Sequence, residues 1–132
     1  MSVLLADHNV EGHARLLIGA LQALGWVDAL DIRLVTFAEV ELTGASTDRE
    51  VWQRAQELGM LLLTANRNKS GADSLEQVLR EEHSSQFLPV LTVSRAKKLL
   101  NDRAYRNACA ERIAEIMLDL DAYRGMPRLF IP

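Results

Sequence analysis

Five polar residues of this sequence stand where apolar segments end or where predicted helices begin. They are Asp7, Asp48, Asn66, Asn68 and Asp73. A hard divalent cation such as Mg²⁺ binds oxygen ligands, usually a few carboxylates together with water, and such an ion activates water for attack on a phosphodiester. The three aspartates therefore form a candidate catalytic and metal-binding set, to which the two asparagines would add neutral oxygen ligands.

Each of these residues also has a structural explanation. Asp48 and Asp73 open predicted helices, where a carboxylate accepts hydrogen bonds from free backbone N–H groups, and Asp7 can do the same in the turn before the first helix. Asn66 and Asn68 can satisfy the backbone of a tight loop. Each asparagine also lacks the charge of an aspartate, so a metal would bind more weakly here than between carboxylates alone. The residues by themselves leave both explanations open.

The elements that must position these residues follow from the apolar pattern. Short unbroken apolar runs are typical of strands buried on both faces, and apolar residues at three- and four-residue spacing are typical of helices. We predict strands over residues 3–6, 31–37, 60–63, 88–93 and 129–131. We predict helices over residues 10–24, 47–58, 73–82 and 105–120, with Asn9 as a cap of the first and capping-box spacing at residues 47–50 and 73–76.

Strands that alternate with helices predict right-handed βαβ units and a three-layer α/β/α sandwich with a mostly parallel central sheet. A length of 132 residues and a hydrophobic content of 48% are enough for one core, so we expect a single domain over residues 1–132. Sites in such folds form outside the carboxyl ends of the strands. The five polar residues follow strands or open helices at that edge, and we expect them to meet there.

The composition excludes several classes of protein. Lys and Arg number 15 against 18 Asp and Glu, a net charge of −3, which is far from that of a dedicated nucleic-acid binder. The one cysteine, Cys109, excludes an internal disulfide and a cysteine metal cluster, and its place on the apolar side of a helix predicts a core residue. We expect a cytoplasmic protein, because the first residues lack the features of a signal peptide and no apolar run is long enough to cross a bilayer.

One concentration of positive charge offers a local contact for a nucleic acid. It comprises Arg95, Lys97, Lys98, Arg103 and Arg106, to which Arg67 and Lys69 can be added. Such residues can line a groove for a phosphate backbone. A solvated helix face has the same composition, so both interpretations stay open.

Three segments together resemble a known family. They are LLADHN at residues 4–9, ASTDRE at residues 45–50 and LLLTANRN at residues 61–68. Their order is similar to that in the small prokaryotic PIN-like domain proteins, in which a strand-ending LLDEN segment, an SD-x-E helix start and an LLT-x-D-x-D strand end form an acidic pocket. The resemblance covers about the first seventy residues.

The resemblance implies an Mg²⁺- or Mn²⁺-dependent ribonuclease, often a toxin paired with an antitoxin protein. Asp7 would be the first acidic ligand and Asp48 the second, while Asn66 and Asn68 occupy the positions of the third and fourth. We hypothesise that Asp73 restores one lost charge. The expected substrate contacts are Asn9, Arg67 and Lys69, and the expected partners are RNA, an antitoxin and a second copy of the chain.

Two further functions compete with the nuclease. A non-catalytic PIN-like binding module would retain the fold with a degenerate acidic site, as the two asparagines suggest. A small-molecule or nucleotide binder at the strand ends is also compatible with the fold, although no glycine-rich phosphate motif supports it.

Overall fold

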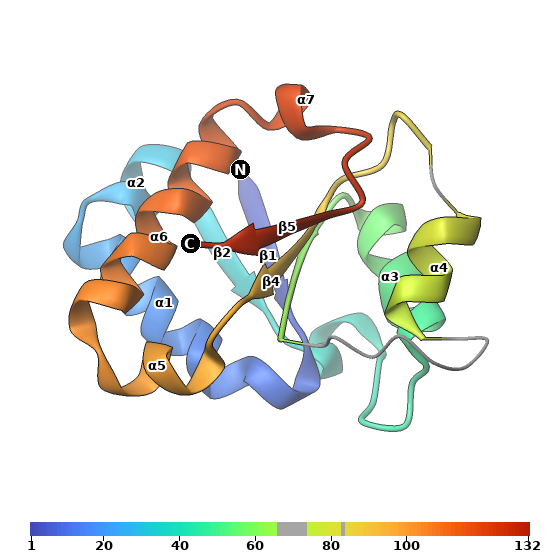
Figure 1. Cartoon of the computed structure of the whole chain (residues 1–132), viewed down its shortest axis with the longest axis horizontal. Coiled ribbons are helices and arrows are strands. Elements are labelled where there is room, and N and C mark those ends of the chain that lie inside the picture. Colours follow the sequence, from blue (N-terminus) through green and yellow to red (C-terminus); the bar gives the residue numbers. More distant parts are fainter. Residues whose placement is uncertain (66–73, 83) are drawn as a thin grey trace.

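A five-stranded parallel sheet forms the centre of the computed structural model, which describes residues 1–65, 74–82 and 84–132 (Figure 1). Its strands, in the order in which they lie side by side, are β2 (Ile32–Val35), β1 (Ser2–Ala6), β3 (Leu61–Thr64), β4 (Val90–Val93) and β5 (Arg128–Ile131). Each neighbouring pair is parallel. The prediction of a mostly parallel sheet is confirmed.

Helices cover both faces of this sheet (Figure 1). On one face lie α1 (Glu11–Ala23), α2 (Trp26–Leu30), α5 (Ala96–Asn101) and α6 (Arg103–Leu118). On the other face lie η2 (Phe37–Val40), α3 (Asp48–Leu58) and α4 (Leu75–Glu81). The short η1 (His8–Val10) and α7 (Leu120–Tyr123) belong to connections. The three-layer α/β/α sandwich is therefore confirmed.

The unbroken apolar runs are explained by two hydrophobic cores, one on each face. Leu4 and Ala6 of β1 belong to the core beneath α1 and α6, whereas Leu5 belongs to the core beneath α3 and α4. Successive side chains of a strand point to opposite faces, so a strand with no polar residue has to be covered on both sides. In β3, Leu61 and Leu63 likewise face one core and Leu62 the other.

Several predicted boundaries shift for identifiable reasons. The strand predicted over residues 31–37 is shorter, because Asp31 ends α2 with a φ of 50° and Thr36 begins η2 with a capping box to Glu39. The N-cap of α1 is Val10, without a side-chain bond, so the prediction that Asn9 caps this helix is wrong. Two short helices, α2 and α5, were not predicted from the sequence.

The predicted helix start at residues 47–50 is confirmed. Thr47 is the N-cap of α3, and its hydroxyl accepts a hydrogen bond from Glu50 N while the Glu50 carboxylate accepts one from Thr47 N. For α4 the observed cap is Ser74, whose hydroxyl accepts from Gln77 N. This corrects the predicted cap at Asp73, a residue that itself lies outside the described part of the chain.

A glutamine joins α3 to the segment before β4. Gln56 Nε2 donates to Leu88 O and Gln56 Oε1 accepts from Leu88 N, both at 2.9 Å. This side chain replaces the strand partner that Leu88 lacks, which explains why β4 begins at Val90 and not at Leu88 as predicted. These two hydrogen bonds fix the position at which the chain enters β4.

We predict that Gln56→Ala lowers the free energy of unfolding by about 2 kcal/mol, because it leaves two backbone groups of the buried Leu88 without partners. Urea denaturation followed by circular dichroism measures the change. The matched control is Gln53→Ala, the same substitution at an exposed position of α3. Equal stability of the two variants would contradict the role given to Gln56.

We predict that iodoacetamide alkylates Cys109 only after the protein unfolds. Cys109 is fully buried, as the sequence analysis expected, and burial raises the pKa of its thiol to about 11, so that the reactive thiolate is scarce at mildly alkaline pH. Mass spectrometry after timed incubation with and without urea measures the labelling. Rapid labelling of the folded protein would show that this face of α6 is open.

Candidate acidic site at the carboxyl edge of the sheet

Asp7 lies directly after β1, beside the end of β3. Its backbone N–H donates to Leu63 O at 2.9 Å, which continues the ladder between the two strands. Its carboxylate oxygen Oδ2 accepts a hydrogen bond of 2.8 Å from Thr64 Oγ1. Asp7 is the N-cap residue of η1 but makes no side-chain cap bond to it, although a backbone hydrogen bond from His8 lowers the pKa of the Asp7 carboxyl.

Asp48 is the first residue of α3, but its carboxylate serves a different helix. The cap position of α3 belongs to Thr47. Asp48 Oδ2 instead accepts a hydrogen bond of 2.9 Å from Leu75 N, at the first residue of α4. The structural role considered from the sequence therefore exists, but it lies at the start of the next helix.

The two aspartates come together across one small cavity of about 10 Å³. Its walls are Asp7, Asp48, Val51, Leu62, Thr64 and Leu75. Burial raises the pKa of Asp7, the hydrogen bond from Thr64 opposes this, and the charge of Asp48 raises the pKa further, with a net upward shift. Asp7 and Asp48 are forty-one positions apart in the sequence but line one cavity. This agrees with the rule that sites in parallel α/β folds form outside the carboxyl ends of the strands.

A larger hollow adjoins the other side of Asp7. It has a volume of about 340 Å³ and is lined by Asp7, Asn9, Val10, His13, Ala65 and Ala96. Asn9, predicted as a substrate contact, therefore lines the same hollow as Asp7. His13 was missed as a site residue, although its spacing of four from Asn9 puts the two on the same side of the chain in a helical segment. Thr64, one position beyond the strand predicted over residues 60–63, is the last residue of β3.

The remaining predicted site residues lie outside the described part of the chain. They are Asn66, Arg67, Asn68, Lys69 and Asp73. Of the described residues nearby in sequence, Ala65 lines the larger hollow and Leu75 lines the smaller cavity.

The donor set of the described site is compatible with a hard cation. Mg²⁺ is commonly held by one or two carboxylates and retains several waters, and Asp7 and Asp48 supply two carboxylates to one cavity. Within residues 1–65, 74–82 and 84–132 there is no group of three or more His, Cys, Asp or Glu side chains that could hold a metal. The described residues thus supply two carboxylates to the cavity, and the remaining ligands of a hard cation can be waters.

No family model, curated protein or solved structure matches this chain. The assignment to the PIN-like proteins therefore remains a prediction from the three motif segments. No helix in the described part of the chain is long and apolar enough to cross a membrane.

We predict that Asp7→Asn stabilises the protein at neutral pH by about 1 kcal/mol, because it removes a partly buried charge that faces Asp48 and keeps an oxygen that can accept from Thr64. The raised pKa of Asp7 means that the folded state binds the proton more tightly than the unfolded state. The stability of the native sequence therefore falls as pH rises from the usual Asp value of 3.8 through the folded pKa.

Thermal unfolding in EDTA across this pH range measures the difference between the two proteins. It should vanish in acid, where Asp7 is protonated in both states. The control is Asp119→Asn, which changes an exposed aspartate whose side chain makes no cap bond. A lower stability of Asp7→Asn at neutral pH would contradict the repulsion described above.

Proposed function

We propose that this protein is a divalent-metal-dependent ribonuclease in which Asp7 and Asp48 hold Mg²⁺ or Mn²⁺. The observation that supports the proposal is the convergence of the two carboxylates on one cavity at the carboxyl edge of the sheet. Burial raises the pKa of Asp7 most, and the nearby charge of Asp48 raises it further, so the ionised pair carries a cost in the folded protein. A bound cation would favour the ionised form of both carboxylates and offset this cost.

Both carboxylates are oriented by hydrogen bonds from the surrounding chain. Thr64 Oγ1 holds Asp7, and the backbone N–H of Leu75 holds Asp48. Such outer contacts fix the direction of the oxygens toward a ligand and are typical of metal sites. When bound, the ion would supply the activation of water and the neutralisation of charge on the phosphate.

The 340 Å³ hollow on the other side of Asp7 is the proposed place of the scissile phosphodiester. Asn9 and His13 line it and can donate hydrogen bonds to phosphate oxygens. Within the same proposal, Asn66 and Asn68 orient water or phosphate, Arg67 and Lys69 contact the RNA backbone, and Asp73 adds a third carboxylate. Hydrolysis would leave a 5′-phosphate.

One observation favours the non-catalytic binding module as a second candidate. The Asp48 carboxylate already has a structural task, because it accepts the N–H of Leu75 at the start of α4. A site with this duty and with asparagines at positions 66 and 68 can bind a cation or RNA without cleaving it. Such a module would bind a partner protein or a nucleic acid. The cytoplasmic location stays a prediction from the sequence, and the pairing with an antitoxin stays a prediction from the resemblance.

The test is incubation of the purified protein with end-labelled single-stranded RNA in Mn²⁺ or Mg²⁺, beside Asp7→Asn and Asp48→Asn purified in the same way. We expect cleavage by the native protein, its loss in EDTA, and a reduction of about a hundredfold or more in each variant. The product should be degraded by an exonuclease that requires a 5′-phosphate.

Asp119→Asn is the control and should cleave like the native protein. Identical cleavage by the native protein and Asp7→Asn would exclude the nuclease. Binding of Mn²⁺ by calorimetry that is lost in Asp7→Asn, without any cleavage, would favour the binding module.

A further inference from the structure

A groove with positive charge runs between α1 and α6, on the face of the sheet opposite α3 and α4. It has a volume of about 440 Å³. Its lining comprises Arg15, Leu16, Gly19, Ala20, Ala23, Arg103, Arg106 and Asn107. Three of these residues are arginines and none is acidic, although the whole chain carries a net charge of −3. Positive charge is therefore concentrated in this groove against the balance of the molecule.

Small residues keep the groove open. The α1 wall is formed by Gly19, Ala20 and Ala23, and a Cβ atom added at Gly19 would meet nothing within 4 Å. The arginines come from both walls, Arg15 from α1 and Arg103 and Arg106 from the first turn of α6. A groove with arginine side chains on both walls and three small residues along α1 can admit a chain of phosphates.

Most described arginines outside the groove form ion pairs with nearby carboxylates, as Arg49, Arg54 and Arg112 do. Among the described arginines outside the groove, Arg95 is the exception. No described carboxylate lies within ion-pair distance of Arg15 or Arg103, both of which are exposed. These two guanidinium groups can therefore meet a phosphate without first breaking an internal pair.

Arg106 is held in place before any ligand arrives. Its Nε donates to Leu99 O and its Nη2 donates to Leu100 O, each at 3.0 Å. These bonds use two of the five N–H donors of the guanidinium and attach it to the end of α5. Because the Arg106 side chain is already ordered, it loses less conformational entropy on binding an anion than a mobile side chain would.

The groove and the hollow beside Asp7 are both lined by residues of α1. His13 lines that hollow, and Leu16, Ala20 and Ala23 of the groove follow it at spacings of three and four, which puts all of them on one side of α1. In Figure 1 the beginnings of α1 and α6 lie with α5 at the end of the molecule where β1 ends. A strand seated in the groove would therefore run along α1 toward the acidic pair.

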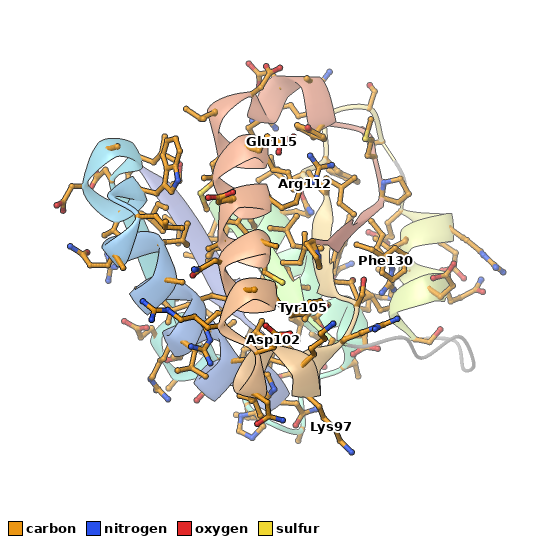
Figure 2. All side chains as sticks on the ribbon, turned by 60° about the vertical axis from the view of Figure 1, so that its left-hand side comes forward. Lys97, Asp102, Tyr105, Arg112, Glu115 and Phe130 are labelled. Carbon is orange, nitrogen blue, oxygen red and sulfur yellow. The ribbon has the colours of Figure 1, made fainter. Side chains whose placement is uncertain are left out.

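The other basic residues of the predicted cluster have different surroundings. Lys98 pairs with Asp102 and lies over the Tyr105 ring. Figure 2 shows Asp102 and Tyr105 near the start of α6, while Lys97 extends outward at the bottom of the view. Of the basic cluster predicted from the sequence, Arg103 and Arg106 line the groove. The third arginine of the groove is Arg15 of α1, which was not predicted as part of the cluster.

We propose that the α1/α6 groove binds the phosphate backbone of single-stranded RNA and guides it to Asp7, an inference that rests on the proposed ribonuclease function. Guanidinium groups on both walls fit phosphate oxygens. The lining contains no aromatic residue and one large apolar residue, Leu16, so it lacks the anchoring pockets by which a protein partner is usually held.

The test measures binding of a short fluorescent oligoribonucleotide by anisotropy, in EDTA, where binding is separate from cleavage. We expect the double variant Arg15→Gln/Arg103→Gln to weaken binding about tenfold or more and to lower the slope of log Kd against log salt by about 1.4, which corresponds to two phosphate contacts on a single strand. The matched control is Arg54→Gln/Arg80→Gln, an equal charge change on α3 and α4, which should bind like the native protein.

A second pair of variants tests the groove without removing an arginine. Gly19→Glu and Gly19→Gln both project into open space, and both residues favour a helix more than glycine does. We expect Gly19→Glu alone to weaken RNA binding about threefold or more, since it adds a negative charge among the arginines. Thermal unfolding of each variant shows that it folds.

Absence of RNA binding by the native protein in EDTA at low salt would overturn the proposal. Equal affinities of the native protein and Arg15→Gln/Arg103→Gln would overturn it as well, and would leave an acidic protein as the ligand to be sought. Equal losses in the two double variants would show only a general charge effect and would also overturn it. A loss of RNA binding that is confined to the groove variants supports the groove proposal even if the protein shows no cleavage with Mn²⁺. The groove proposal and the nuclease proposal can therefore fail independently of each other.

Discussion

The chemistry of the acidic site depends on the parallel pairing of β1 with β3. This pairing puts the end of β1 beside the end of β3, so that the hydroxyl of Thr64 meets the carboxylate of Asp7. Because both faces of the two strands are covered, their register cannot slip by one residue without moving leucines out of both cores. The position of Asp7 is therefore determined by hydrophobic packing far more than by any contact of its own side chain.

The architecture could be predicted from the sequence because the apolar composition of the central strands indicates that both of their faces are buried. Residues 3–6 and 60–63 contain no polar residue, and only a sheet covered on both faces can accept them. The capping box at Thr47 and Glu50 was equally local and equally readable. Contacts between distant segments were not readable: nothing in the residues around Gln56 indicates that its amide pairs with the backbone of Leu88.

In the candidate site, too, some features could be predicted from the sequence and others could not. That Asp7 and Asp48 share an edge follows from the order of strands and helices, because parallel strands put their carboxyl ends on one side. The direction of each carboxylate depended on partners from other elements, Thr64 for one and Leu75 for the other. The basic groove was hidden for a similar reason, since Arg15 and Arg103 become neighbours only when α1 packs against α6.

The hydrogen bond from Leu75 N to the Asp48 carboxylate shows that residue 48 has a role in folding in addition to its proposed role as a metal ligand. Folding needs an oxygen acceptor at residue 48 to receive the first N–H of α4, and the amide oxygen of asparagine can accept this bond, although more weakly than a carboxylate. A cation ligand, in contrast, requires the negative charge itself. A lineage that no longer used the ion could therefore exchange Asp for Asn here and keep the start of α4, because the loss of the charged bond would be offset in part by the loss of repulsion with Asp7.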